Sequence, residues 1–368
     1  MSKTDHIEND PSFKGLTVNK GVEHHSAVNK SAAERFLKQK RKKLTADDYV
    51  AGILDGNITI LSQAVTLIES SLANDQEIAQ EIILKCLPHS GNSVRIGITG
   101  VPGAGKSTFI EAMGLNLIEQ GSKVAVLAID PSSERTKGSI LGDKTRMEQL
   151  STKDKAYIRP SPSAGSLGGV ARKTRETIIL CEAAGYSHIL IETVGVGQSE
   201  TAVHSMVDFF LFVLIGGAGD ELQGIKRGIM EMADGIAVNK ADGDNIQRAN
   251  LTKAQYKNAL HLFPPTKSGW RPEVRTCSSL SPKGVVDIWE MINEYIKHTK
   301  SNDYFTQNRK EQAQYWMHET IVEKLKNNFY QNSLIQEKIP TFEVMVNNEQ
   351  ISSFEAARVL LNTYFKNL

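Results

Sequence analysis

Cysteine is scarce in this chain, whose 368 residues contain only three: Cys86, Cys181 and Cys277. They lie far apart, and none belongs to a C-x-x-C pair or to a Cys/His cluster. A disulfide framework and a structural zinc site are therefore not expected. The composition fits a reducing compartment, and we expect a cytoplasmic protein.

Long apolar runs are also missing. The longest, Phe209 to Ile215, is far shorter than the roughly 20 residues that a membrane-spanning helix needs. The first residues contain no apolar segment of the kind found in secretory signals, and the acidic Asp5, Glu8 and Asp10 argue against a transit peptide. We therefore expect no membrane partner.

Neither sign of charge dominates, because 43 Lys and Arg against 42 Asp and Glu give a formal net charge of +1. The overall charge thus predicts no nucleic-acid partner. A hydrophobic content of 40% is typical of a soluble globular protein. The basic run 38–43 is interpreted as a solvated helix face or linker, with contact to an acidic partner or RNA as the alternative.

The N-terminal part divides into a polar tail and a helical module. Residues 1–44 show no sustained periodicity and are predicted to be disordered. Residues 45–90 are predicted to form three helices, the first capped by Thr45 and ended by Gly56, the third capped by Asn74.

Residues 93–108 combine an apolar run, a glycine-rich turn and the start of a helical pattern. The turn matches G-x-x-x-x-G-K-[ST], the P-loop motif, in the strand–helix context that the motif requires. Its backbone N–H groups and the helix N-terminus would face a phosphate, the lysine the β/γ-phosphates, and the serine hydroxyl Mg²⁺. The predicted nucleotide-binding residues of this loop are Gly100, Val101, Pro102, Gly103, Ala104, Gly105, Lys106, Ser107 and Thr108.

Two acidic positions follow further along the chain. Residues 124–129 are entirely apolar, as in a parallel strand covered on both faces, and Asp130 stands at its carboxyl end. The stretch 138–147 mixes glycines with Asp143, Lys144 and Arg146, which suits a switch loop around phosphate and metal. A plain surface loop is the alternative reading.

A third strand, 188–191, leads into Glu192 and, three residues later, Gly195. This spacing fits a Walker B acid that helps to hold Mg²⁺ and a glycine N–H that meets the γ-phosphate. A further buried strand, 209–215, precedes the glycine-rich charged segment 216–227, a candidate for a second switch.

The sequence N-K-A-D follows another apolar strand and presents Asn239 and Asp242 to a base. A carboxylate accepts hydrogen bonds from guanine N1–H and N2–H₂, whereas adenine has no donors there. A site built on such pairing can reject the wrong partner by about 10⁴-fold or more. Ser278 and Ser279, after a later strand, fit the last base-contacting loop.

From about Ser301 the chain is predicted to be helical again. Met317, Ile321, Leu325 and Phe329 recur at helical spacing, and Ser352 with Glu355 resembles a capping box. This apolar extension, 301–368, would form a dimer arm or pack on the N-terminal helices.

In their order, the blocks G-V-P-G-A-G-K-S-T, A-I-D-P-S-S, S-I-L-G-D-K-T-R-M, E-T-V-G-V-G-Q-S-E, G-D-E-L-Q-G-I-K and N-K-A-D resemble the MeaB/ArgK family. Its members are GTPase chaperones of adenosylcobalamin-dependent methylmalonyl-CoA mutase, once labelled lysine/arginine/ornithine transport ATPases. The likeness runs from about Tyr49 to the C-terminus. It implies a metallochaperone-type P-loop GTPase that forms homodimers and assists cofactor loading and protection of an acyl-CoA mutase.

The resemblance also implies roles for single residues. Asp130, Asp143 and Glu192 would serve Mg²⁺ and the switch regions, together with Ser107. Lys226 would stabilise the charge that develops on hydrolysis once a partner orders its loop. The implied catalytic residues are Lys106, Asp143 and Lys226. The implied residues on the base side of the site are Asn239, Lys240, Asp242, Ser278, Ser279 and Leu280.

The predicted fold is an α/β P-loop NTPase over residues 91–300, with a mostly parallel central sheet flanked by helices, and with helical extensions at both ends. Two other functions stay open: an ATP-dependent transport ATPase or kinase, and a nickel-insertion GTPase. N-K-A-D argues against the first, and the lack of clustered Cys and His against the second. The chain contains no D-x-H-x-x-G, a cobalamin-binding signature, so a partner would carry that cofactor.

Overall fold

The computed structural model describes residues 44–129, 147–160, 167–193, 199–217, 227–279 and 282–366. It divides the chain into two units, 1–44 and 45–368, and every helix and strand below belongs to the second. No helix among the described residues is long and apolar enough to cross a membrane.

Seven strands form one sheet in the order β3-β2-β4-β1-β5-β6-β7, and each neighbouring pair is parallel. After the central β1, the strands β2, β3 and β4 are added on one side of it, and β5, β6 and β7 follow on the other side. Strand order therefore reverses beside β1, where open α/β sheets bind ligands at the carboxyl ends of their strands. The strands are β1 (Val94–Gly100), β2 (Val124–Ile129), β3 (Ala156–Arg159), β4 (His188–Thr193), β5 (Phe209–Ile215), β6 (Gly235–Asn239) and β7 (Glu273–Thr276).

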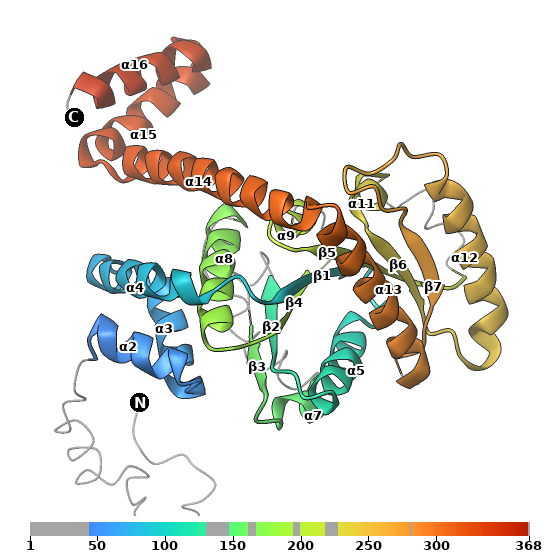
Figure 1. The fold of residues 1–368 in the computed structure, drawn as a ribbon. Helices are drawn as coiled ribbons and strands as arrows, with labels where there is room; N and C mark the ends of the chain where they lie inside the picture. Colours follow the sequence, from blue (N-terminus) through green and yellow to red (C-terminus); the bar gives the residue numbers. More distant parts are fainter. Residues whose placement is uncertain are drawn as a thin grey trace, which may run out of the picture. The chain divides into compact units, whose positions relative to one another are not determined.

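The central strands are apolar along their whole length because helices cover both faces of the sheet. On one face Val124 and Val126 share a core with α5 (Lys106–Glu119) and α13 (Pro282–Ser301). On the other, Ala125 packs with α8 (Leu167–Ala183) and the N-terminal helices. Figure 1 shows α5 and α8 on opposite sides of the strands. A smaller cluster joins β5 and β6 to α12 (Ile246–Leu260).

The remaining helices connect or extend this core (Figure 1). They are α2 (Ala46–Leu54), α3 (Ile58–Glu69), α4 (Ala73–Cys86), η2 (Leu87–His89), α7 (Glu148–Ser151), α9 (Ser199–His204), α11 (Arg227–Met232), η4 (Gly243–Asn245), α14 (Tyr304–Gln331), α15 (Ser333–Asn347) and α16 (Ser353–Lys366).

The N-terminal module contains the three predicted helices, α2, α3 and α4. Thr45 caps the first through a complete capping box with Asp48, and Gly56 follows that helix at φ +74°. The prediction that Asn74 caps the third is wrong, because α4 already begins at Ala73. The turn before it is held instead by Ser70, whose hydroxyl donates to Asp75 Oδ2 at 2.7 Å and accepts from Leu72 N at 3.2 Å.

The C-terminal extension is helical, as predicted, but α13 runs on to Ser301 and α14 starts after Asp303, which has φ +61°. Ser352 Oγ accepts from Glu355 N at 3.2 Å, whereas the Glu355 carboxylate pairs with Arg358, so only half of the capping box forms. Along α14, the side chains of Met317 (53% exposed), Ile321 (48%) and Leu325 (59%) are not covered by the N-terminal helices.

Fold class and most strand positions are confirmed, but β3 was not predicted. Its four residues, Ala-Tyr-Ile-Arg, are too short and too mixed to stand out as an apolar run. It lies at the edge of the sheet, paired with β2 alone, which explains the weaker signal.

Candidate nucleotide-binding site

The P-loop joins β1 to α5 through glycines that no other residue could replace without strain. Gly105 has φ +84° at the N-terminus of α5, a left-handed conformation that favours glycine. A Cβ on Gly100 would lie 2.1 Å from the carbonyl oxygen of Val213 on β5. The loop is thus packed directly against the next strand, and the free N–H groups of α5 lie at the carboxyl edge of the sheet.

Lys106, in the first turn of α5, folds back over the loop. Its Nζ donates to the carbonyl oxygens of Gly100 at 2.9 Å and Val101 at 3.3 Å. Burial lowers the pKa of Lys106, while Glu192 and Glu200 act in the opposite direction. The lysine is therefore held against the loop backbone, in a position to bring positive charge to a phosphate.

The structure brings the two predicted metal ligands among the described residues into contact. Ser107 Oγ donates to Glu192 Oε1 at 2.9 Å, because β4 pairs with β1 and Glu192 lies opposite Ile98. Neighbouring oxygens around an octahedral Mg²⁺ with bonds of about 2.0–2.1 Å lie about 2.9 Å apart, and both are the hard donors that Mg²⁺ prefers. This pair therefore fits a magnesium ion.

The base-side residues meet the P-loop at the end of β6. Asn239 Nδ2 donates to the carbonyl oxygen of Ala104 at 2.8 Å, and Asn239 Oδ1 accepts from Ser279 N at 3.2 Å. Ser278 Oγ donates to the Asp242 carboxylate. Residues far apart in the sequence thus form one continuous edge from the P-loop to the N-K-A-D turn, where Lys240 has φ +55°.

Five predicted site residues lie outside the described part of the chain: Asp130, Asp143, Gly195, Lys226 and Leu280. The same holds for the polar tail and for most of the segments 138–147 and 216–227. Their roles stay predictions. In the described part of the chain, no group of three or more His, Cys, Asp or Glu residues could hold a metal ion.

Glu200 has no role in any of the motifs described above. It is only 1% exposed, in the first turn of α9, and its negative charge acts to raise the pKa of Lys106. Its position as the last acid of E-T-V-G-V-G-Q-S-E was visible, but its burial and its effect on the pKa of Lys106 depend on the fold.

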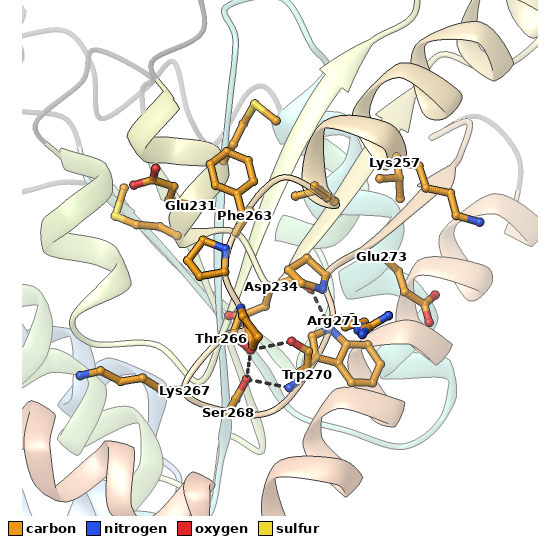
Figure 2. A pocket seen from close by; sticks show the side chains of 18 of the residues that line it. Glu231, Asp234, Lys257, Phe263, Thr266, Lys267, Ser268, Trp270, Arg271 and Glu273 are labelled. Atoms are coloured by element: carbon orange, nitrogen blue, oxygen red, sulfur yellow. Dashed lines mark hydrogen bonds between the residues drawn. The ribbon is translucent and has the colours of Figure 1, made fainter.

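A separate hollow lies at the opposite, amino-terminal edge of the sheet, where β6 and β7 begin. Figure 2 shows the loop between α12 and β7 that forms it, with Thr266, Ser268 and Trp270 joined by hydrogen bonds. Trp270 Nε1 donates to the carbonyl oxygen of Asp234 at 3.0 Å, which fixes the loop to the start of β6. None of the predicted nucleotide-binding residues that the structure describes lines this hollow.

Comparison with known proteins agrees with this geometry. Residues 61–333 match the family described as "Methylmalonyl Co-A mutase-associated GTPase MeaB". The GTPase ArgK of Escherichia coli is 42% identical over 319 residues, which are 84% of this chain and 96% of that protein. The mitochondrial "methylmalonic aciduria type A homolog" of Mus musculus is 44% identical over 328 residues, 86% of this chain and 79% of that protein.

A solved structure shares the fold. The crystal structure of a protein named "LAO/AO transport system kinase" superposes with a TM-score of 0.69 at 36% identity, covering 87% of this chain and 97% of that one. The family match spans most of the chain and includes the P-loop, the Glu192 strand and the N-K-A-D turn. This chain therefore belongs to the MeaB family and is a GTPase.

Proposed function

We propose that this GTPase binds GTP with Mg²⁺ between the P-loop and the N-K-A-D turn, and that it assists adenosylcobalamin loading and protection of methylmalonyl-CoA mutase or a related acyl-CoA mutase. The observation that carries the nucleotide site is the 2.8 Å hydrogen bond from Asn239 Nδ2 to Ala104 O. It fastens the strand that would hold the base to the loop that would hold the phosphates.

Guanine selectivity is assigned to Asp242. Its carboxylate would accept hydrogen bonds from guanine N1–H and N2–H₂, and the hydroxyl of Ser278 orients it. Adenine offers no donor at these positions, so binding it would leave the carboxylate unpaired. Lost pairing of this kind costs a site several powers of ten in affinity.

Catalysis is assigned to charges around the γ-phosphate. Ser107 and Glu192 would hold the magnesium ion, with Asp130 and Asp143 completing the site as the family resemblance implies, and the ion would neutralise phosphate charge. Lys106 would contact the β- and γ-phosphates from the start of α5. Lys226 would stabilise the transition state once a partner orders its loop. A cationic side chain supplied in this way is worth about 10³–10⁵ in rate.

Hydrolysis without a partner is expected to be slow. Two residues close to Glu192 in the sequence, Gln198 and His204, are of types that can align an attacking water. Gln198 lies outside the described residues. His204 packs edge-on against Phe210, with ring centroids 5.6 Å apart, and burial lowers its pKa. His204 is therefore assigned a packing role.

The client protein is proposed from the family. The matching family carries the mutase in its description, and the mouse relative is named after methylmalonic aciduria. Because this chain has no D-x-H-x-x-G, the mutase would bring the cobalamin. A cytoplasmic location is proposed with it, consistent with three cysteines that are all free and buried.

Homodimerisation is proposed through α14. Met317, Ile321 and Leu325 recur at i, i+4 and i+8 on one side of this helix and are about half exposed. A second copy of the chain would bury such a stripe.

The mutase assignment is tested by measuring GTP hydrolysis with and without an adenosylcobalamin-dependent methylmalonyl-CoA mutase. We expect the mutase to accelerate hydrolysis at least tenfold in the intact chain, and to have no effect on a Lys226→Ala variant that still binds GTP. An unchanged rate in the intact chain would contradict the chaperone role. Capture of the mutase from cell extract by the GTP-loaded chain is a second check.

An ATP-dependent transport ATPase or kinase is the alternative, since one structural relative is named a transport system kinase. Equal affinities for GTP and ATP would favour it. The nickel-insertion alternative would require stoichiometric nickel binding by the purified chain.

A further inference from the structure

Three side chains of α14 donate hydrogen bonds to one short stretch of the nucleotide-binding core. Arg309 binds the Asp208 carboxylate with Nε–Oδ1 at 2.7 Å and Nη2–Oδ2 at 2.6 Å. Gln312 Nε2 donates to the carbonyl oxygen of Val207 at 2.7 Å. Trp316 Nε1 donates to the carbonyl oxygen of Ser205 at 3.0 Å. We call these three contacts the arm contact.

The spacing of the donors makes the arm contact specific. Positions 309, 312 and 316 are separated by three and then four residues, so they share one face of the helix. Gln312 and Trp316, at 6% and 8% exposed, are the two buried residues that α14 contributes among the described residues. Gln312 Oε1 is buried without a hydrogen-bond partner in the described part of the chain, so the donated bond to Val207 alone holds this amide. The helix is thus seated on residues 205–208 by directional polar contacts.

Residues 205–208 connect α9 to β5. On the side away from α14 they pack against β1. Met206 is fully buried and Val207 is 3% exposed. Gly97 of β1 allows the close approach, because a Cβ there would lie 2.8 Å from Val203 Cγ1 and 3.1 Å from Val207 Cγ2. Asp208 Oδ2 also accepts from Arg95 N of β1 at 2.8 Å. The connection is therefore held between β1 and α14, and α14 cannot shift without disturbing it.

Residues 205–208 also follow, along the chain, the segment that begins at Glu192 in the nucleotide site and includes α9. Glu192, whose carboxylate contacts Ser107 of the P-loop, lies near the end of β4, and the chain then passes to α9. α9 is only six residues long and packs on β1, the strand that leads into the P-loop, because a Cβ on Gly97 of β1 would lie 2.8 Å from Val203 Cγ1 of α9. The buried Glu200 in its first turn acts to raise the pKa of Lys106. Residues 205–208 therefore lie at the other end of a six-residue helix that packs on the strand leading into the P-loop.

We propose that Arg309, Gln312 and Trp316 are positioning residues of the nucleotide site: through residues 205–208 and α9 they couple the seating of α14 to the choice between GTP and GDP. The proposal rests on the proposed nucleotide function and adds its regulation. Met317, Ile321 and Leu325 are exposed on the far side of the same helix, so whatever covers that stripe would act on the nucleotide site through α14 and the arm contact.

Linkage makes the coupling reciprocal: if the nucleotide changes the seating of α14, loosening α14 must change the relative affinities for the nucleotides by the same factor. Coupling energies between distinct sites commonly correspond to about 5–150-fold. A merely structural role would lower stability or weaken both nucleotides equally, and would leave their ratio unchanged.

The test compares three variants of the full chain. Gln312→Leu removes the bond to Val207 O, and Trp316→Phe removes the bond to Ser205 O while keeping an aromatic ring in the core. Gln314→Leu is the matched control, since Gln314 is exposed on the same helix. For each, calorimetry with Mg²⁺ gives the affinities for GDP and for a non-hydrolysable GTP analogue, and hydrogen exchange gives the protection of residues 304–320 with each nucleotide.

We expect the ratio of the two affinities to shift at least fivefold in Gln312→Leu and in Trp316→Phe, with no such shift in Gln314→Leu. In the intact chain the exchange of residues 304–320 should differ between the two nucleotides, and this difference should shrink in both variants. A smaller shift in both variants, or an equal shift in the control, would overturn the inference while leaving the proposed function intact. An intact chain that binds neither nucleotide would overturn the proposed function, and the inference with it.

Discussion

At the scale of single residues, the site combines groups whose types follow from the chemistry they perform. Ser107 and Glu192 supply hard oxygen donors, Lys106 supplies a cation, and Asp242 supplies an acceptor pair for a base. The motif spacing predicted these residue types. The contacts that join them depend on the fold, above all the bond from Asn239 to the carbonyl oxygen of Ala104.

Changing Asp242 tests the base side of the site. In Asp242→Ala two charge-assisted hydrogen bonds to guanine would be lost, each worth about 1.5–3 kcal/mol. We expect the GDP affinity, measured by calorimetry, to fall by about 10²–10⁴-fold. Asp244→Ala is the matched control, because this carboxylate is also exposed and lies two residues away in η4. Equal losses in the two variants would count against base recognition by Asp242.

Changing Lys226 tests the catalytic assignment that the family resemblance implies. Lys226→Ala should keep its GTP affinity and lose the whole stimulation by the mutase, so that its rate with the mutase falls to its rate without it; a cationic side chain supplied to the transition state is worth up to about 10³–10⁵ in rate. Single-turnover hydrolysis measured with and without the mutase separates the two steps. Lys257→Ala on α12 serves as the control, and a stimulated rate that survives in Lys226→Ala would remove the residue from the mechanism.

At the scale of helices and strands, periodicity predicted the buried strands well because helices cover them on both faces. It failed at β3, a short edge strand, and at the start of α4, where Ser70 rather than Asn74 organises the turn. It could not say which face of α14 packs on the core, since both the arm contact and the apolar stripe occur at helical spacing. Only the docking of Arg309, Gln312 and Trp316 on residues 205–208 distinguishes the two faces.

The apolar stripe of α14 makes a prediction at this scale. Ile321→Glu combined with Leu325→Glu would place two charges in the proposed dimer contact, where their desolvation opposes association. We expect the chain to sediment as a dimer and this variant as a monomer in analytical ultracentrifugation. Lys324→Glu, which alters charge on the same turn without touching the stripe, should remain dimeric. A double variant that sediments with the intact chain would show that the stripe is not the dimer contact.

At the scale of the whole molecule, a buried cluster of charges ties together segments that are distant in the sequence. Arg95 Nε donates to Glu182 at 2.8 Å, and Ser93 Oγ donates to the same carboxylate at 2.6 Å. Arg309 joins this region by donating to the carbonyl oxygens of Gly91 at 2.5 Å and Ser93 at 2.6 Å. β1, α8 and α14 thus meet in one network, which no local sequence pattern could have indicated.

Glu182 gives this network a pH dependence. Burial alone would raise the pKa of its carboxyl, but Arg95, Ser93 and the Gly91 N–H outweigh burial and lower it. Its stabilisation is therefore present above about pH 4.3, the ordinary value for Glu, and is lost as the pH falls through the lower folded-state pKa. Arg175 faces the same cluster, and burial together with the charge of Arg95 lowers its pKa to about 9.

Glu182→Gln should therefore leave the Arg95 charge unpaired in the core, a change that costs about 3–5 kcal/mol of unfolding free energy at pH 7. The fall in stability between pH 5 and pH 3 should also be shallower than in the intact chain. Urea unfolding across this pH range measures both effects. Glu355→Gln, at an exposed pair with Arg358, should change little, and a Glu182→Gln variant as stable as that control would contradict the role of the network.

The central claim is that a guanine nucleotide is held between the P-loop and Asp242. Calorimetry of the intact chain with GDP and with ADP, each with Mg²⁺, tests it most directly. The account predicts a preference for GDP of about 10³-fold or more. Equal affinities for the two nucleotides would contradict it.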